Sequence, residues 1–195
     1  MKNLLEKNSE NYIRKFFKKN NWEPLEFQIE AWESFLRGES GIIQVPTGYG
    51  KTYAALMGPL LKLKEHKSSK GINILLVTPL KALSRDLKKS ILNAIQFFDP
   101  NITAGIRNGD TSNYVKRKQI INPPNILITT PESLTLLIAN KESNKLFSNL
   151  FSIIIDEWHE LMGCKRGNQC ELALSWLRGN NQNIQIWGMS ATIGN

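Results

Sequence analysis

The amino-acid sequence predicts an α/β fold in which helices cover both faces of a mostly parallel central sheet. The first observation is a series of short apolar runs, typical of buried strands, at positions 42–45, 74–77, 126–128, 151–155 and 184–187. The second is that amphipathic stretches of helical length separate most of these runs. Strands that alternate with helices are typical of a parallel sheet, because each parallel connection must cross one face of it.

The predicted helices lie at positions 53–67, 81–98 and 169–178, where apolar residues recur at helical spacing. The first 40 residues are also expected to be helical, in two segments divided by Pro24. We therefore expect an N-terminal helical segment, 1–40, followed by a sheet-containing domain, 41–195. Nothing in the 195 residues resembles an internal repeat or an interdomain linker.

The charge balance favours a polyanionic partner. Lys and Arg number 25 against 17 acidic residues, a formal net charge of +8. Such a surface gains affinity for DNA or RNA from counterion release, although charge alone needs a motif beside it. No apolar run has the length of a membrane span and the first residues lack the apolar core of a signal peptide, so a cytoplasmic location without membrane partners is expected. Cys164 and Cys170 have a spacing that fits neither a zinc site nor a disulfide framework, and they are expected to be reduced structural thiols.

The segment Val45-Pro46-Thr47-Gly48-Tyr49-Gly50-Lys51-Thr52 follows the first apolar run and precedes a predicted helix. Its two glycines let successive backbone N–H groups point inward, its lysine adds a positive charge, and its last threonine offers a hydroxyl to Mg²⁺. The general motif has a glycine where this chain has Val45. The alternative is a glycine-rich turn that happens to precede Lys-Thr. The strand before it and the helix after it favour a phosphate-binding loop for a nucleoside triphosphate, namely ATP with Mg²⁺.

Two carboxylates, Asp156 and Glu157, follow directly on the apolar run 151–155. At the end of a strand, Asp156 is expected to hold Mg²⁺ through water, and Glu157 to orient or deprotonate the attacking water. An ordinary acidic loop is the alternative. The phosphate-binding loop upstream favours the catalytic interpretation, because the two features together are more specific than either one.

Taken together, these segments resemble the motifs of superfamily 2 helicases. Pro46 to Thr52 looks like motif I, and Asp156-Glu157-Trp158-His159 looks like the DExH box. The further motifs occur in the expected order: the adenine-reading Gln28, motif Ia at 78–83, motif Ib at 129–134 and motif III at 190–192. Segments 107–112, 156–161 and 165–167 look most like the Lhr-type branch, particularly its DNA-ligase-associated members.

The resemblance implies a RecA-like domain and a role for each matching residue. Gln28, Thr47, Gly48, Tyr49, Gly50, Lys51 and Thr52 would bind the nucleotide; Lys51, Asp156 and Glu157 would act in catalysis; Thr52, Asp156 and Glu157 would hold the metal. His159, Ser190 and Thr192 would couple the nucleotide to strand binding. The residues that would hold the sugar-phosphate backbone are Thr78, Pro79, Lys81, Arg107, Thr130, Pro131 and Glu132.

Several of these residues have simpler alternatives. A threonine can cap a helix, a lysine can be a solvated charge, and His159 can be a satisfied structural histidine. Trp22 or Phe17 could stack on adenine, although core packing is the simpler role for either. The basic pair 165–166, expected in a glycine-flanked loop, could contact nucleic acid or only solvent. Three other apolar side chains are expected in the core, Trp32, Met57 and Trp176, and one histidine is expected to be solvated, His66.

The resemblance ends at motif III, so the chain is expected to be an N-terminal motor domain without the second RecA-like domain that normally follows in the same chain. It is expected to bind ATP, to turn it over weakly and not to unwind processively alone. Expected partners are single-stranded or partly duplex DNA, with RNA possible, and DNA repair proteins such as a ligase. The alternatives are an ATP-gated nucleic-acid-binding module without turnover and an unrelated P-loop enzyme, which segments 130–132 and 190–192 disfavour.

Overall fold

The computed structural model describes residues 2–65, 71–79, 83–161 and 164–191. Within these residues six parallel strands form one sheet in the order β1-β6-β5-β2-β4-β3. The strands are β1 Gly41–Gln44, β2 Ile74–Val77, β3 Ala104–Arg107, β4 Ile126–Thr129, β5 Ser152–Ile155 and β6 Gln185–Ser190. The parallel sheet confirms the predicted fold class. The sequence did not predict β3, because this half-buried edge strand has no continuous apolar run.

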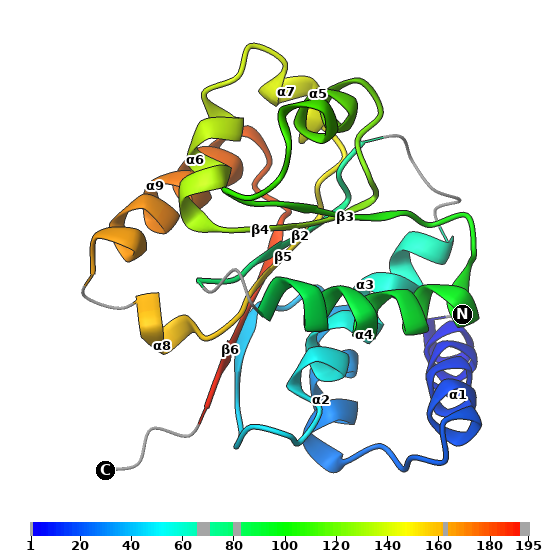
Figure 1. The fold of residues 1–195 in the computed structure, drawn as a ribbon. Helices are drawn as coiled ribbons and strands as arrows, with labels where there is room; N and C mark the ends of the chain where they lie inside the picture. The colour runs from blue at the N-terminus through cyan, green and yellow to red at the C-terminus, as the bar shows by residue number, and fades with distance from the viewer. Residues whose placement is uncertain (1, 66–70, 80–82, 162–163, 192–195) are drawn as a thin grey trace.

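Helices cover both faces of the sheet (Figure 1). The chain order is α1 Lys2–Lys19, α2 Glu26–Leu36, α3 Lys51–Glu65, α4 Leu83–Phe98, α5 Asn113–Ile121, α6 Pro131–Ile138, α7 Ser143–Leu146, α8 Trp158–Leu161 and α9 Lys165–Asn180. Helices α1 to α4 lie together on one side of the sheet, and α6, α7 and α9 lie on the other. Among the described residues, none of these helices is both long and apolar enough to cross a membrane.

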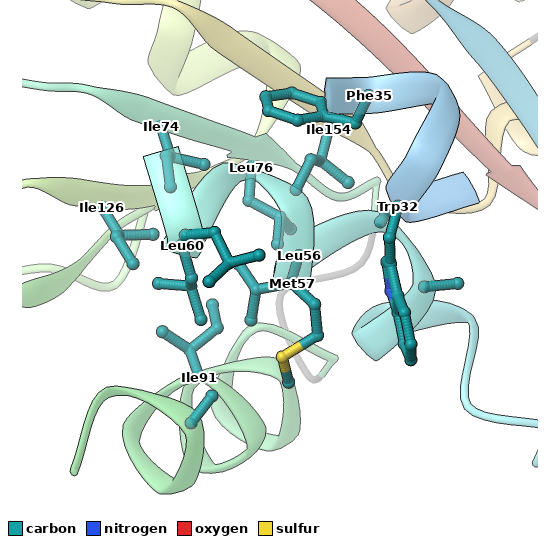
Figure 2. Packing of buried hydrophobic residues seen from close by; sticks show 14 of the residues in the cluster. Trp32, Phe35, Leu56, Met57, Leu60, Ile74, Leu76, Ile91, Ile126 and Ile154 are labelled. Atoms are coloured by element: carbon teal, nitrogen blue, oxygen red, sulfur yellow. The ribbon is translucent and has the colours of Figure 1, made fainter. Parts of the chain in front are cut away.

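The alternation of side chains along the central strands divides the interior into two cores. In β2, Ile74 and Leu76 face the core shared with α1 to α4, whereas Leu75 and Val77 face the core shared with α6 to α9. Both faces are buried, which explains why these strands are continuous apolar runs. Figure 2 shows α3 packing Leu56, Met57 and Leu60 against the strands of the first core, with the expected core residue Trp32 nearby.

The N-terminal segment belongs to the first core. Ile13, Phe16 and Phe17 of α1 and Trp32 of α2 are buried in the cluster that contains α3. Trp176, the other predicted core tryptophan, is partly buried against the second core. Cys164 and Cys170 are free thiols, and burial raises the pKa of Cys170 to about 11.

The predicted basic loop at 165–166 is wrong, because these residues form the first turn of α9. The helix begins earlier than expected because Gly167 allows its first turn to pass very close to the preceding chain: a Cβ at this position would lie 1.8 Å from the Leu161 carbonyl oxygen. Short helices such as α5 and α8 were also missed, since their apolar residues do not recur at helical spacing over a long stretch.

Candidate nucleotide and nucleic-acid site

The carboxyl ends of all the strands meet at one edge of the sheet, because every pairing in it is parallel. The segments that the sequence singled out follow these ends: 46–50 after β1, 78–79 after β2, 130–132 after β4, 156–159 after β5 and 191 after β6. Open α/β sheets bind their ligands at this edge. The tertiary structure therefore brings together residues that lie far apart in the sequence.

The segment after β1 turns sharply into α3. Gly48 and Gly50 have φ angles of 88° and 81°, a left-handed conformation that glycine adopts without steric cost. The Gly50 carbonyl then accepts hydrogen bonds from the N–H groups of Tyr53 and Ala54, which starts the helix. Thr47, Gly48 and Tyr49 are exposed, and Thr52 is half-buried in the first turn. The loop therefore presents backbone at a helix N-terminus, where anions bind.

Lys51 supplies the strongest electrostatic signal of the site. The residue is only 8% exposed. Its Nζ is buried and has no hydrogen-bond partner within the described ranges. A buried ammonium group is unfavourable unless an anion or acceptor neutralises it. The arrangement therefore fits a bound phosphate group.

Gln28 holds the loop from the side of α2. Its Oε1 accepts a hydrogen bond from the Leu25 N–H at 3.0 Å, and its Nε2 donates to the Gly50 carbonyl at 3.1 Å. A Cβ on Gly50 would lie 2.7 Å from Gln28 Nε2, so glycine is needed there for this contact as well as for its φ angle. The carboxamide oxygen keeps a second lone pair. Recognition of adenine by Gln28 stays a prediction.

A cavity of about 790 Å³ lies beside this loop, between it and the α1–α2 connection. Trp22, 41% exposed, lines this cavity and rests against Tyr53, with ring centroids 5.4 Å apart. Phe17 also borders the cavity but is 3% exposed and belongs to the first core, so core packing is its main role. The sequence analysis overlooked Tyr53, whose only signal was its place one residue after the loop. The cavity offers aromatic surface beside the loop, which is typical of ligand pockets.

The two carboxylates after β5 differ in environment. Asp156 is buried, and its N–H donates to the Val77 carbonyl at 2.8 Å. Burial, followed by the nearby charge of Glu157, raises the pKa of Asp156 to about 6, against smaller opposing effects of the Glu157 backbone N–H, Lys51 and Thr78. Glu157 has a φ angle of 46°, a strained conformation for a residue with a side chain. A carboxylate with a raised pKa beside an unpaired ammonium is typical of a site that binds a further charged group.

His159 and Ser190 meet across the gap between α8 and β6. Ser190 Oγ lies 2.9 Å from His159 Nδ1, and its hydroxyl donates to the Ala191 carbonyl. Which of the two groups donates in this contact depends on the tautomer of His159. Glu157 Oε2 lies 3.5 Å from the same nitrogen. The predicted coupling residues His159 and Ser190 are therefore in contact, and Thr192 lies outside the described residues.

The predicted strand-binding residues are placed at the same edge. Thr78 and Pro79 are buried at the end of β2, and Lys81 lies outside the described residues. Thr130 is the N-cap of α6, where its hydroxyl accepts a hydrogen bond from the Ser133 N–H, and Pro131 occupies the first turn. The helix-cap alternative for Thr130 therefore holds for its side chain. Its role in nucleic-acid binding stays a prediction.

Two arginines of the predicted nucleic-acid-binding segments bind other groups within the protein. Arg166 Nε lies 2.8 Å from Glu132 Oε1, and its Nη1 donates to the Pro79 carbonyl at 3.4 Å. This contact joins the segments after β2 and β4 to the start of α9. Arg107 is half-buried, burial lowers its pKa, and its Nη1 donates to the Lys116 carbonyl. No local pattern in the sequence could have signalled these long-range contacts.

Comparisons with known proteins define the class. The family model described as DEAD/DEAH box helicase matches residues 25–195, and the chain belongs to this family.

Within that class, the Lhr helicases are close relatives. The chain is 34% identical over 183 residues to the Lhr helicase/probable uracil glycosylase of Mycolicibacterium smegmatis, covering 87% of this chain and 12% of that protein. It is 35% identical over 171 residues to the ATP-dependent helicase Lhr-Core of Sulfolobus acidocaldarius, covering 80% of this chain and 19% of that protein. The structure of the Mycobacterium smegmatis helicase Lhr bound to ssDNA and AMP-PNP superposes with a TM-score of 0.84 at 32% identity, covering 93% of this chain and 24% of that one. The chain thus spans less than a quarter of the length of each of these relatives.

Proposed function

We propose that this chain is the ATP-binding and nucleic-acid-binding motor domain of an ATP-dependent DNA helicase, in which ATP hydrolysis drives movement along a strand. Two relatives are named helicases, and the related Lhr structure contains ssDNA and AMP-PNP. The single observation that carries the proposal is the buried Lys51 ammonium, which has no hydrogen-bond partner in the part of the chain that the structure describes. It lies in the first turn of α3 directly after the loop, where the γ- or β-phosphate of ATP would neutralise it.

The donor set also fits Mg²⁺. The Thr52 hydroxyl and the Asp156 carboxylate are hard oxygen ligands, which this ion prefers, and the described residues contain no cluster of three or more acidic, cysteine or histidine side chains for a metal. The phosphates of the nucleotide would therefore complete the coordination. Mg²⁺ would neutralise charge on those phosphates. Glu157 Oε2 is buried without a hydrogen-bond partner among the described residues, and His159 Nδ1 lies 3.5 Å from it. This carboxylate would orient a water molecule or accept its proton.

The same arrangement supports a coupling route. Glu157, which would contact the attacking water, lies 3.5 Å from His159 Nδ1, and that nitrogen contacts Ser190. On the strand side, Arg166 joins the segments of Pro79 and Glu132. We propose that nucleotide binding shifts the contacts of His159 with Glu157 and Ser190. Nucleic-acid binding then uses the segments of Pro79 and Glu132 that Arg166 joins. DNA as the preferred strand and a DNA repair partner such as a ligase belong to the same proposal, and they rest on the resemblance at 107–112, 156–161 and 165–167. A cytoplasmic location is also proposed, and it rests on the lack of a membrane-length apolar run and of a signal peptide in the sequence.

Nucleotide binding by Lys51→Ala tests the proposal. A charge-assisted contact to phosphate is lost, so affinity for MgATP should fall roughly 10- to 150-fold. Lys145→Ala, which removes an exposed charge, is the matched control and should bind as the parent does. Thermal unfolding of both variants establishes that each is folded. Equal MgATP affinity in folded Lys51→Ala and parent would refute the assignment.

An ATP-gated module that acts without turnover is the second candidate, because arginines from a second RecA-like domain complete the hydrolytic site in the family that the sequence resembles. ATPase activity of the 195-residue chain, measured with and without single-stranded DNA and with and without an added second domain, separates the two. DNA-stimulated turnover that appears when the second domain is added supports the helicase motor. Nucleotide-dependent DNA binding with no turnover in any of these mixtures supports the module.

A further inference from the structure

Helix α5 presents an outward face that the fold does not use. None of its residues is buried. Tyr114, Arg117, Lys118 and Ile121 are all exposed, Tyr114 and Ile121 each at 76%. Their spacing of three, four and seven residues places them on one side of the helix. We call these four residues the α5 stripe.

The α5 stripe is cationic and has an aromatic ring at its start. The helix sequence contains three consecutive basic residues, 116–118, and no acidic residue. Neither Arg117 nor Lys118 forms an ion pair within the described ranges, whereas Arg37, for example, is paired with two glutamates. Exposed cations beside an exposed aromatic ring suit a polyanion that also carries flat apolar surfaces. Single-stranded nucleic acid has this combination of phosphates and bases.

The stripe is held rigidly and begins beside the edge described above. The Ser112 hydroxyl caps the helix by accepting from the Val115 N–H. On its inner side, the Gln119 Nε2 donates to the Ile106 carbonyl and Arg107 Nη1 donates to the Lys116 carbonyl, both at 3.0 Å. These bonds fix α5 against the last residues of β3. The first turn of α5 therefore lies beside the carboxyl end of β3, the edge strand that pairs with β4.

We propose that the α5 stripe is a nucleic-acid contact surface that extends the strand path past the edge of the sheet. Tyr114 stacks on a base, and Arg117 and Lys118 bind the neighbouring phosphates. The contact reads no sequence, because stacking and phosphate binding are common to all bases. The inference rests on the proposed function, since it adds a segment to the strand that the motor binds.

Binding of labelled oligo(dT) and oligo(U) by the 195-residue chain tests the proposal. Arg117→Glu with Lys118→Glu should weaken binding by at least roughly tenfold at low salt, and should reduce the slope of log affinity against log salt by about 1.4, since about 0.7 is expected for each single-strand phosphate contact. Tyr114→Ala should weaken binding roughly fivefold or more, and Tyr114→Phe should restore it, because the phenyl ring still stacks. Equal losses on both oligonucleotides assign the contact to phosphate and base planes, and a loss on one alone assigns it to that nucleic acid.

The matched control is the double reversal Lys141→Glu with Lys145→Glu, which changes the net charge equally in exposed residues between α6 and β5. MgATP affinity should be unchanged in all variants. The proposal is overturned if the stripe variants bind as the control does, an outcome that would leave the surface to an acidic protein partner. It also falls if the parent chain binds neither oligonucleotide at low salt, and only that second outcome would also contradict the proposed function.

Discussion

Replacing Asp156 by asparagine should stabilise the folded protein in the absence of nucleotide. The carboxyl group has a pKa of about 6 in the folded chain, compared with an ordinary value of 3.8, chiefly because it is buried. Between about pH 4 and pH 6 the folded protein keeps a proton that the unfolded chain has released. Stability of the parent therefore falls as pH rises through this window, and the loss is complete above it.

The size of the effect follows from the two pKa values. Their difference corresponds to about 3 kcal/mol at neutral pH and to about half of that near pH 5. The asparagine side chain is nearly the same size and cannot ionise, so the variant escapes this loss. For a domain of this length the gain would raise the unfolding temperature by roughly 6–12 °C near neutral pH.

Urea unfolding of parent and variant near pH 7.5, 5 and 4 measures the prediction. Glu30→Gln is the control, because it removes an exposed carboxylate of α2 and should change stability by less than about 0.5 kcal/mol at each pH. The same Asp156 variant should lose Mg²⁺-dependent ATP binding, as expected where a functional group reduces stability. The prediction is refuted if the variant is no more stable than the parent near pH 7.5 and the difference in unfolding free energy is the same at lower pH. In that case the ionised Asp156 carboxylate would not reduce the stability of the fold.

Two further pairs of substitutions test the packing around the site. Gly167→Ala should destabilise the fold by about 3 kcal/mol or more, because its Cβ would lie 1.8 Å from the Leu161 carbonyl oxygen. Gly179→Ala in the same helix, where a Cβ meets nothing within 4 Å, should instead stabilise it by about 0.5–1 kcal/mol; equal effects in urea unfolding would contradict the close approach. Phe17→Ala should cost about 3–5 kcal/mol of stability, whereas Trp22→Ala should mainly weaken MgATP binding, as titration calorimetry can show. A large stability loss in Trp22→Ala with unchanged nucleotide affinity would make Trp22 a core residue.

Local sequence was sufficient for the turn after β1 and for most of the sheet. Gly48 and Gly50 adopt the left-handed φ angles that a curled loop needs, and four of the five predicted runs lie in fully or largely buried strands. These predictions succeed because backbone freedom and continuous apolar character are properties of neighbouring residues. Strand β3 and helix α5 were not predicted, because neither carries a periodic apolar pattern. Both are held instead by polar contacts to other segments.

In the site, too, local sequence predicted some features and long-range contacts decided the others. The residue types at Lys51, Asp156 and His159 and their places after apolar runs were readable in the sequence. Their pairing was not: the contact of His159 with Ser190 joins residues 31 positions apart, and Arg166 lies 87 positions from the Pro79 carbonyl that it contacts. Short-range patterns therefore determine the chemical groups and the strands that carry them. Which groups face one another, and which cations remain free for a ligand, depends on the order of strands in the sheet, because parallel pairing brings distant strand ends to one edge.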